Sequence, residues 1–338
     1  MARRHPQLRT GFTQTAAGVP VQVVSARYDV PVRDVSVDSE SEAEQIMQTD
    51  RDTPFDLASP PLWRVLLLRL PDGRDRVVIN RQFLVWDGWS NGLVVGELLA
   101  RYENPDLPST PDTTFARYLT WLASRDRDAA RRAWATALGG LEEPTLLAHR
   151  LAAPVGIPLR RRAELDKDTS SSLVGAARER GVTLNAVVTA ALALAISSAT
   201  GRTDVVFGIT VAGRPPEVDG LDSAPGMFLS TVPVRAVLDP RESIDALVRR
   251  MQNERVEAME HDYLGLAEII EVSPHRTLFD TLCVVQNFVN QDSASALNAA
   301  HGVEGSDSID HTNYPLTVVV TPGDRLAVTV EYLSLIHI

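Results

Sequence analysis

The chain has 338 residues, of which 44% are hydrophobic and 23% are charged, and its formal net charge is −11. This is the composition of a globular protein, and the length suffices for about two domains. Its single cysteine, Cys283, excludes an intrachain disulfide and a cysteine-based metal site. The apolar neighbours of Cys283 in TLCVVQ predict a buried packing role for this thiol.

The charge distribution also excludes some kinds of partner. Arg160-Arg161-Arg162 is the one dense basic run, and we interpret it as a solvated strand end. The acidic total argues against a nucleic-acid partner. No apolar run reaches the length of a membrane span, and MARRHPQ at the N-terminus has no apolar core like that of a secretion signal. These features predict a cytoplasmic protein that does not bind a membrane.

Turn and periodicity signals predict mixed strands and helices up to residue 140. Strands are expected at 21–24, 62–70 and 76–80. The last two are joined by the turn sequence Pro71-Asp72-Gly73. Helices are expected at 39–51, 93–102 and 114–123, with a fourth around Trp134 that ends at Gly139-Gly140.

Residues 141–158 are loose and contain proline, so we place a lobe boundary there, between 1–150 and 151–338. In the second lobe, strands are expected at 159–165, 205–211, 228–237, 282–286, 316–321 and 326–332. Helices are expected at 169–180, 183–200 and 243–259. Residues 290–312 are rich in Ser, Asp, Asn and Gly, and they indicate a surface loop or bridge. Because both halves mix helices and strands, the sequence predicts an α/β protein with two lobes.

Seven stretches resemble motifs of one family, the condensation domain of non-ribosomal peptide synthetases. They are RRHPQLRTGF (3–12), DGWS (87–90), FARYLTW (115–121), VFGITVAGRPPEV (206–218), APGMFLSTVPVR (224–235), HDYLGLAEII (261–270) and LFDTLCVVQNF (278–288). Each is weak alone, but together they follow the family's order and cover nearly the whole chain.

The resemblance implies a fold and a chemistry. Two chloramphenicol acetyltransferase-like lobes would form a V with a tunnel between them. An acyl or peptidyl group and an aminoacyl group would enter from opposite sides on the 4'-phosphopantetheine arms of peptidyl carrier protein domains. The amine would attack the thioester to form an amide. The implied partners are the carrier domains and neighbouring synthetase domains, and no cofactor or metal would bind directly.

The chain is short relative to the family that it resembles. That family opens with a strand and a helix carrying an SxxQxxLW motif, and it continues past VEY into a final helix. We expect the N-terminal lobe to lack its opening strand and helix. The ending SLIHI resembles translated adaptor read-through, and the alternative is a genuine short strand end.

The family's HHxxxDGWS motif is degenerate here. Alignment on Asp87-Gly88 places the motif's two histidines at Gln82 and Phe83. Phe83, at the position of the second histidine, has no donor or acceptor. Gln82 has both but cannot act as a base, and in a strand it would point to the opposite side from Phe83. We therefore expect position 83 to be catalytically inactive.

The rest of the loop matches the family. The resemblance implies that Asp87 pairs with an arginine of the opposite lobe, and Arg214 is our candidate for a bidentate partner. The alternative for Asp87 is a helix N-cap, and both interpretations stay open. Gly88 would allow close backbone approach or a positive φ.

Three further residues are implied to line the substrate tunnel, namely Trp89, Ser90 and Gly226. For Trp89 we favour packing over substrate contact. Ser90 fits an N-cap equally well, and because no base neighbours it in the sequence, we do not expect a serine nucleophile.

The remaining histidines are scattered and lack metal-ligand spacing. The resemblance places His5 with Arg9, and His261 with Asp262, in motifs that are structural in the family. Tyr263 is expected to be packed with its hydroxyl hydrogen-bonded.

These observations leave two functional hypotheses. In the first, the chain retains some amide- or ester-forming activity, because positioning alone accelerates aminolysis. In the second, it is a non-catalytic scaffold, carrier-docking or recruitment domain, as in a degenerate relative from glycopeptide assembly lines that recruits oxidising enzymes. Decay of a gene fragment is a third alternative. Phe83 favours loss of standard catalysis.

Overall fold

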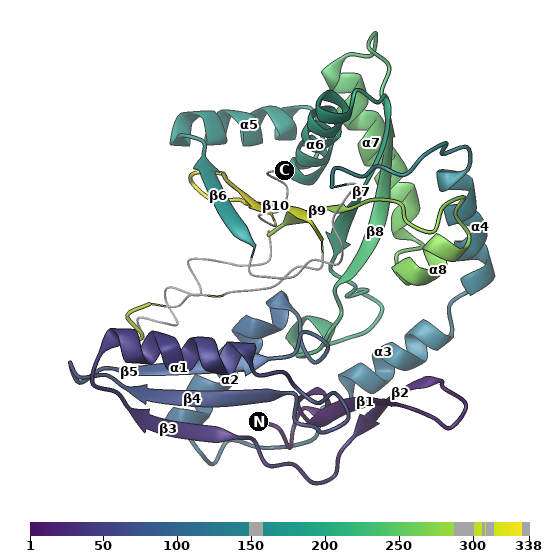
Figure 1. Ribbon diagram of the computed structural model, residues 1–338. Coiled ribbons are helices and arrows are strands. Elements are labelled where there is room, and N and C mark those ends of the chain that lie inside the picture. Colours follow the sequence, from purple (N-terminus) through teal and green to yellow (C-terminus); the bar gives the residue numbers. More distant parts are fainter. Residues whose placement is uncertain (149–157, 287–300, 306–307, 309–313, 333–338) are drawn as a thin grey trace. The chain divides into compact units, whose positions relative to one another are not determined.

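The computed structural model describes residues 1–148, 158–286, 301–305, 308 and 314–332 (Figure 1). The contacts divide the chain into two compact units. The first unit comprises Met1–Trp121 and Arg214–Phe228, and the second comprises Leu122–Gly213 and Leu229–Ile338. By their contacts, residues 122–148 group with the second unit and residues 214–228 with the first. The lobe boundary expected near residue 150 stays a prediction.

The first unit contains two small sheets and three helices that position the candidate site. Its elements are η1 (Pro6–Arg9), β1 (Thr10–Gln14), β2 (Pro20–Val24), β3 (Val32–Ser36), α1 (Glu40–Asp52), β4 (Trp63–Arg69), β5 (Asp75–Arg81), α2 (Gly88–Glu103), α3 (Thr114–Ala123) and η2 (Leu221–Ser223). Strands β1 and β2 pair antiparallel, and β4 pairs parallel with β3 and antiparallel with β5.

Successive side chains of β4 point to opposite faces of this three-stranded sheet, so the strand contributes to a hydrophobic cluster on each face. Leu66 and Leu68 are buried with Ala43 of α1 on one face, and Trp63 is buried with Val94 of α2 in a separate cluster. At the start of α1 the hydroxyl of the N-cap Ser39 accepts from the Glu42 N–H at 3.2 Å, and the Glu42 carboxylate accepts at 2.8 Å from the N–H of Asp38, the residue before the cap.

The second unit is built on one mixed sheet in the order β6-β11-β10-β9-β7-β8. Its elements are α4 (Arg127–Leu138), β6 (Leu159–Glu164), α5 (Lys167–Glu179), α6 (Leu184–Thr200), β7 (Asp204–Val211), β8 (Ser230–Val237), α7 (Ile244–Met259), α8 (Leu266–Glu271), β9 (Thr281–Val285), β10 (Leu316–Thr321) and β11 (Ala327–Tyr332). β9 is parallel to β7 and β10, whereas β8, β11 and β6 join the sheet through antiparallel pairs.

Helix α6 shows how the sequence builds the core of this unit. Thr183 caps its N-terminus by accepting from the Ala186 N–H at 3.1 Å, and Gly201 ends it with a φ of 71°. Ala190 and Ala193 are buried, and small side chains allow α6 to lie close to α7 and β7 (Figure 1).

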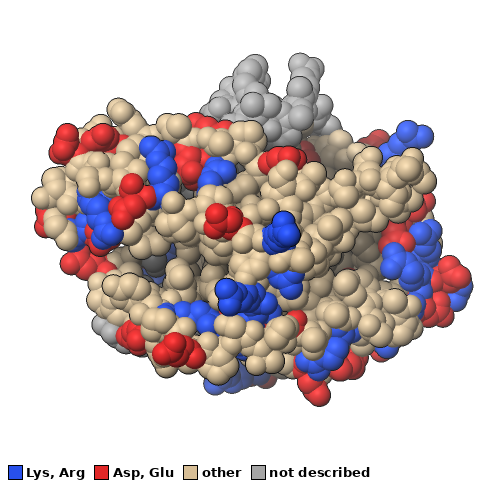
Figure 2. Space-filling model, turned by 90° about the horizontal axis from the view of Figure 1, so that it is seen from below, with Lys and Arg blue, Asp and Glu red and all other residues tan. Residues whose placement is uncertain are grey.

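Two predictions from composition are confirmed in this sheet. Cys283 lies in β9 with 1% of its surface exposed. β6, which carries the three arginines, is exposed along its whole length, and Arg160 pairs with Glu331 at 2.8 Å. Figure 2 shows acidic and basic side chains next to one another in several groups, with other residues covering most of the face that it presents.

In the described part of the chain, no single helix is long and apolar enough to cross a membrane. One pair of helices, α5 and α6, meets the length and composition criteria together and is bent by 107° at the break between them.

Of the segment predicted to be a loop at 290–312, residues 301–305 and 308 are described. The terminal SLIHI lies outside the described residues, as do Asn287 and Phe288 of the seventh motif.

Candidate active site

The loop that resembles the family's histidine motif begins where β5 ends, at Arg81. Gln82 N–H donates to the Leu62 carbonyl at 2.8 Å, and Val85 N–H donates to the Gln82 carbonyl at 3.2 Å. The Gln82 side-chain oxygen accepts from the N–H of Phe83 at 2.9 Å. The expectation that Gln82 and Phe83 alternate as in a strand is therefore wrong, because both follow the strand and Gln82 folds back to stabilise the turn.

Phe83 is half-buried in this turn and lies beneath a cation. The Arg81 guanidinium carbon is 4.8 Å from the centroid of the Phe83 ring and 5.6 Å from that of the Trp86 ring. A phenyl ring cannot accept a proton, and the Gln82 amide is not a base. The geometry thus provides an aromatic surface at the position where the family has its second histidine.

Asp87 satisfies both structural interpretations of the sequence at once. Its side chain is fully buried and caps α2, with Oδ1 accepting from the Ser90 N–H at 2.9 Å. Oδ1 also lies 3.4 Å from Nη2 of Arg214, and Oδ2 accepts from the Phe228 N–H at 3.1 Å. The loop is therefore tied to the segment 214–228 through one carboxylate.

The expected bidentate geometry of Arg214 is wrong. Its side chain is 2% exposed, and Nη1 is used by backbone carbonyls, those of Leu221 and, at 2.9 Å, Ala224. Nη2 is the guanidinium nitrogen that faces Asp87 Oδ1. The guanidinium also lies 4.3 Å from the Phe228 ring centroid. Burial lowers the pKa of Arg214, while the charge of Asp87 raises it.

Ser90 is a buried linker between the same two segments. Its hydroxyl oxygen accepts from the Gly226 N–H at 3.0 Å and from Arg214 Nη2 at 3.1 Å. Its single proton has acceptors in Asp87 Oδ1 at 2.8 Å and the Gly226 carbonyl at 3.0 Å. The N-cap alternative for Ser90 is wrong, because Asp87 occupies that position. A hydroxyl with its donor and both acceptor sites occupied, and with no exposed surface, is not available as a nucleophile.

The other loop residues have local roles. Gly88 is the first residue of α2 and is not among the glycines with positive φ, so that alternative does not apply. The Trp89 indole N–H donates to the Asp222 carbonyl at 3.0 Å, as a packing residue would. A Cβ at Gly226 would lie 2.7 Å from the Phe228 ring, which explains the glycine. The tunnel-lining role of Trp89, Ser90 and Gly226 stays a prediction.

Sequence analysis missed an aromatic cluster that supports the segment 214–228. Phe228 contacts two side chains of α3, with ring centroids 5.5 Å from Phe115 and 5.1 Å from Tyr118. Val218, Leu221 and Ala224 complete the buried cluster. The motifs FARYLTW and APGMFLSTVPVR carry these residues, but no spacing in the sequence indicates that they meet.

Two further residues that the motifs place in structural roles, His5 and Tyr263, have hydrogen-bond or ion-pair partners. His5 is 3% exposed, with Nε2 2.6 Å from Glu97 and Nδ1 3.4 Å from Asp112. The nearby His5 ring and the Thr114 N–H, which donates to Asp112, hold the pKa of Asp112 well below its usual range. The Tyr263 hydroxyl donates to the Asp126 carbonyl at 2.7 Å, which confirms that prediction. No group of His, Cys, Asp or Glu residues in the described ranges could hold a metal ion.

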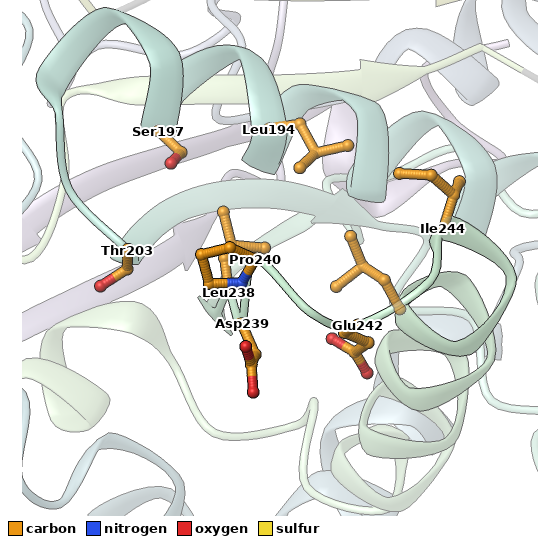
Figure 3. A pocket seen from close by; sticks show the side chains of 9 residues that line it. Leu194, Ser197, Thr203, Leu238, Asp239, Pro240, Glu242 and Ile244 are labelled. Atoms are coloured by element: carbon orange, nitrogen blue, oxygen red, sulfur yellow. The ribbon is translucent and has the colours of Figure 1, made fainter.

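A pocket of about 290 Å³ lies in the second unit and contains none of the predicted site residues (Figure 3). It is lined by Leu194, Ser197, Thr203, Leu238, Asp239, Pro240, Glu242, Ile244 and Leu247. Of the two carboxylates, Asp239 pairs with Arg241 at 3.2 Å and Glu242 with Arg250 at 2.8 Å. None of the residues that line this pocket belongs to the histidine-motif loop.

Comparison with known proteins agrees with the motifs. The family model of the condensation domain matches residues 1–335. The chain thus belongs to the condensation-domain family of non-ribosomal peptide synthetases. Chondramide synthase of Chondromyces crocatus is 30% identical over 95% of this chain and 8% of its own length. Vanchrobactin synthetase of Vibrio anguillarum is 31% identical over 98% of the chain and 12% of its own length. The chain therefore spans a small part of these relatives.

Solved structures show the same fold. A holo four-domain nonribosomal peptide synthetase bound to AMP and glycine has a TM-score of 0.80 at 18% identity, covering 98% of this chain and 27% of that one. The X-domain from teicoplanin biosynthesis has a TM-score of 0.78 at 19% identity, covering 98% and 80%. The predicted condensation-domain fold, related to chloramphenicol acetyltransferase, is confirmed.

Proposed function

We propose that this chain is a condensation domain within a larger cytoplasmic synthetase and that it forms little or no amide on its own. Its substrates would be acyl and aminoacyl thioesters on the 4'-phosphopantetheine arms of peptidyl carrier domains, supplied by neighbouring synthetase domains. The family match and the much longer synthetase relatives support this context. The observation that carries the loss of catalysis is Phe83 at the position of the second histidine.

The reaction needs a proton acceptor or a hydrogen-bonding group near the amine. The amine nitrogen forms a bond to the thioester carbon, the carbon–sulfur bond breaks, and the proton lost by nitrogen ends on the departing thiol. A well-placed base contributes roughly 10²–10⁴-fold to such a step. Phe83 and Gln82 cannot supply that contribution, and the Asp87–Arg214–Ser90 network is occupied in holding the loop.

The test is a reconstituted condensation. The chain, in its synthetase context and with two loaded carrier domains, should yield amide product at least about 100-fold more slowly than a histidine-bearing relative. Mass spectrometry of the carrier-bound product measures this. Phe83→His should increase the yield, and Phe83→Leu is the matched control that should not. Turnover by the unsubstituted chain at the relative's rate would contradict the proposal.

A second candidate is a non-catalytic scaffold or recruitment domain that docks carriers or tailoring enzymes. The observation that favours it is the hydrogen-bonded network of Asp87, Ser90 and Arg214, which is retained without a base. This role predicts that carrier domains bind equally well to the unsubstituted chain and to Phe83→His, as measured by calorimetry. Absence of any carrier binding would exclude the docking form of this candidate.

A further inference from the structure

Strand β2 has an outer edge that pairs with no strand in the described part of the chain. β1 and β2 form a sheet of two strands, separate from the sheet β3-β4-β5 of the same unit (Figure 1). The opposite edge of this hairpin, along β1, is partly covered, because the Phe12 N–H donates to the Leu57 carbonyl at 2.7 Å. A sheet of two strands is only marginally stable in water, and a further strand stabilises it.

Hydrogen bonds at the two ends of the hairpin show which residues of β2 face this open edge. The Thr15 N–H donates to the Val19 carbonyl at 2.9 Å. At the other end, the Ser25 N–H donates to the Arg9 carbonyl at 2.9 Å. Residue pairs with and without mutual hydrogen bonds alternate along an antiparallel ladder. In the observed register, the odd-numbered residues of β2 therefore bond to β1, and the even-numbered residues direct their backbone groups outward.

The outward backbone groups of β2 belong to Pro20, Gln22 and Val24. Pro20 offers a carbonyl and has no N–H, so the outward donors are those of Gln22 and Val24. Neither N–H has a hydrogen-bond acceptor among the described residues. The strand thus presents a short row of donors and acceptors that another strand would satisfy.

The side chains of β2 do not protect this edge. Residues 10–26 include no charged residue, although 23% of the chain is charged. Proteins commonly guard exposed edges with charged side chains, which oppose pairing with another chain. The outer strands β3, β5, β6 and β8 follow this rule, since each carries at least one arginine. On β2, by contrast, Val23 and Val24 are 47% and 46% exposed.

The sequence of β2 is also self-complementary about Gln22. We propose that β2 is a dimerisation edge, at which two copies of this chain pair antiparallel about a two-fold axis at Gln22. The two Gln22 residues exchange both of their backbone hydrogen bonds, and the Val24 N–H of each copy donates to the Pro20 carbonyl of the other. Val21 of each copy lies opposite Val23 of the other. A two-fold interface requires such a self-complementary patch.

The contact joins the two hairpins into one continuous sheet. Because each strand contributes only five residues, the interface is smaller than that of a stable dimer. We therefore expect a reversible dimer with a dissociation constant of roughly 10 µM to 1 mM. The inference is independent of the proposed function, since no group of the histidine-motif loop takes part in the contact.

Sedimentation equilibrium between about 10 µM and 1 mM tests whether the dimer forms. Gln22→Pro removes the donor at the axis and leaves the bonds to β1 in place, so it should weaken dimerisation at least about 10-fold. Gln14→Pro is the matched control, because it makes the same change at an outward-facing position of β1, and it should dimerise like the unsubstituted chain. A chain that stays monomeric, or equal weakening by the two changes, would overturn the proposal. Slow exchange of the Gln22 N–H in such a monomer would assign the edge to another segment of the chain.

Charge complementation tests the position of the axis. Like charges directly opposite each other destabilise a strand pair, so Gln22→Lys and Gln22→Glu should each dimerise at least about threefold more weakly than the unsubstituted chain. An equimolar mixture of the two variants should form heterodimers, which native mass spectrometry distinguishes by mass. A mixture without heterodimers would exclude an axis at Gln22.

A disulfide provides a third readout of the same geometry. Cys283 is 1% exposed, so a thiol introduced by Gln22→Cys would be the accessible one. Opposed residues of a hydrogen-bonded antiparallel pair have Cα atoms about 5.5 Å apart, which a disulfide can span. Mild oxidation should convert Gln22→Cys into a covalent dimer, whereas the equally exposed control Gln14→Cys should remain largely monomeric. Equal yields of covalent dimer from both variants would contradict the pairing of β2 strands.

Discussion

At the scale of single residues, Asp87 combines roles that proteins usually distribute over several side chains. It caps α2, accepts the Phe228 N–H and compensates the charge of the buried Arg214. A buried ion pair contributes little compared with an apolar replacement, but removal of one partner leaves an uncompensated charge. This asymmetry makes the site sensitive to loss of the carboxylate.

We expect Asp87→Ala to lower the free energy of unfolding of the first unit by about 3–5 kcal/mol, because Arg214 would keep its charge without a carboxylate. Asp87→Asn should cost less, since its carbonyl oxygen can still cap α2. Urea unfolding followed by tryptophan fluorescence measures the stability of both variants. The signal reports on this unit because it contains Trp63, Trp86, Trp89 and Trp121. Equal stabilities of Asp87→Ala and the unsubstituted chain would contradict the structural role.

Cys283 gives a prediction about pH. Burial raises the pKa of its thiol to about 12. At pH 8, roughly one thiol in ten thousand would be ionised, so iodoacetamide should not modify the folded chain and should modify one site after unfolding in urea. The buried neutral thiol adds stability below about pH 9, and this contribution is lost as pH rises towards 12. Rapid modification of the folded chain would show that Cys283 is accessible.

At the scale of elements, β7 depends on a close approach that only glycine allows. Gly208 lies where a Cβ would be 2.4 Å from the Phe279 ring and 3.1 Å from a methyl group of Thr231. Phe279 cannot easily turn aside, because it is buried and stacks on Tyr314 with ring centroids 5.7 Å apart.

Gly208→Ala should therefore destabilise the second unit by about 1–3 kcal/mol through overpacking. Gly175→Ala is the matched control, because Gly175 lies inside α5 with nothing within 4 Å of the added Cβ. That change should raise stability by up to about 1 kcal/mol. Thermal unfolding compares the stabilities of the two variants. A Gly208→Ala variant more stable than the unsubstituted chain would show that Phe279 moves aside to accommodate the added methyl group.

Sequence patterns predicted most elements but not all. Helix α3 and β10 have the predicted bounds, because strong periodicity marks them. Helix α2 begins at Gly88, five residues before the prediction, since the Asp87 cap outweighs the low helix propensity of Gly88 and Gly92. β1, β3 and α8 were missed, being five or six residues long and largely exposed or irregular in pattern.

The candidate site was predicted in part. The motifs identified Asp87 and its partner Arg214 by likeness to the family. They could not indicate the backbone N–H of Phe228 or the two backbone groups of Gly226, because main-chain donors and acceptors leave no trace in residue identity. The Arg81–Phe83 stack was also missed, since the sequence analysis considered only the alternation of Gln82 and Phe83 in a strand-like run.

At the scale of the whole molecule, the division of residues into two units does not follow their order along the chain. The first unit is discontinuous in sequence, because Arg214–Phe228 belongs to it although β7 and β8 on either side belong to the second unit. The segment is held in the first unit by hydrogen bonds to Asp87 and Ser90 and by the aromatic cluster of α3.

Hydrogen–deuterium exchange tests this grouping. Asp87→Ala should accelerate exchange in peptides covering 214–228, where the Phe228 N–H loses its acceptor. Peptides covering β8 should exchange as before, since their backbone groups pair with β7. Matching acceleration in both sets of peptides would show that the segment follows the second unit instead.

The discontinuity of the first unit has a consequence for synthesis on the ribosome. Ser90 and its partner Gly226 are separated by 136 residues. At about 5–20 residues per second, roughly 7 to 27 s pass between their emergence. During this interval Asp87 and Ser90 stay hydrated, because the groups that will bury them have not been translated. Vectorial folding from the N-terminus therefore cannot complete the first unit, and a pause downstream of residue 228 would favour its assembly.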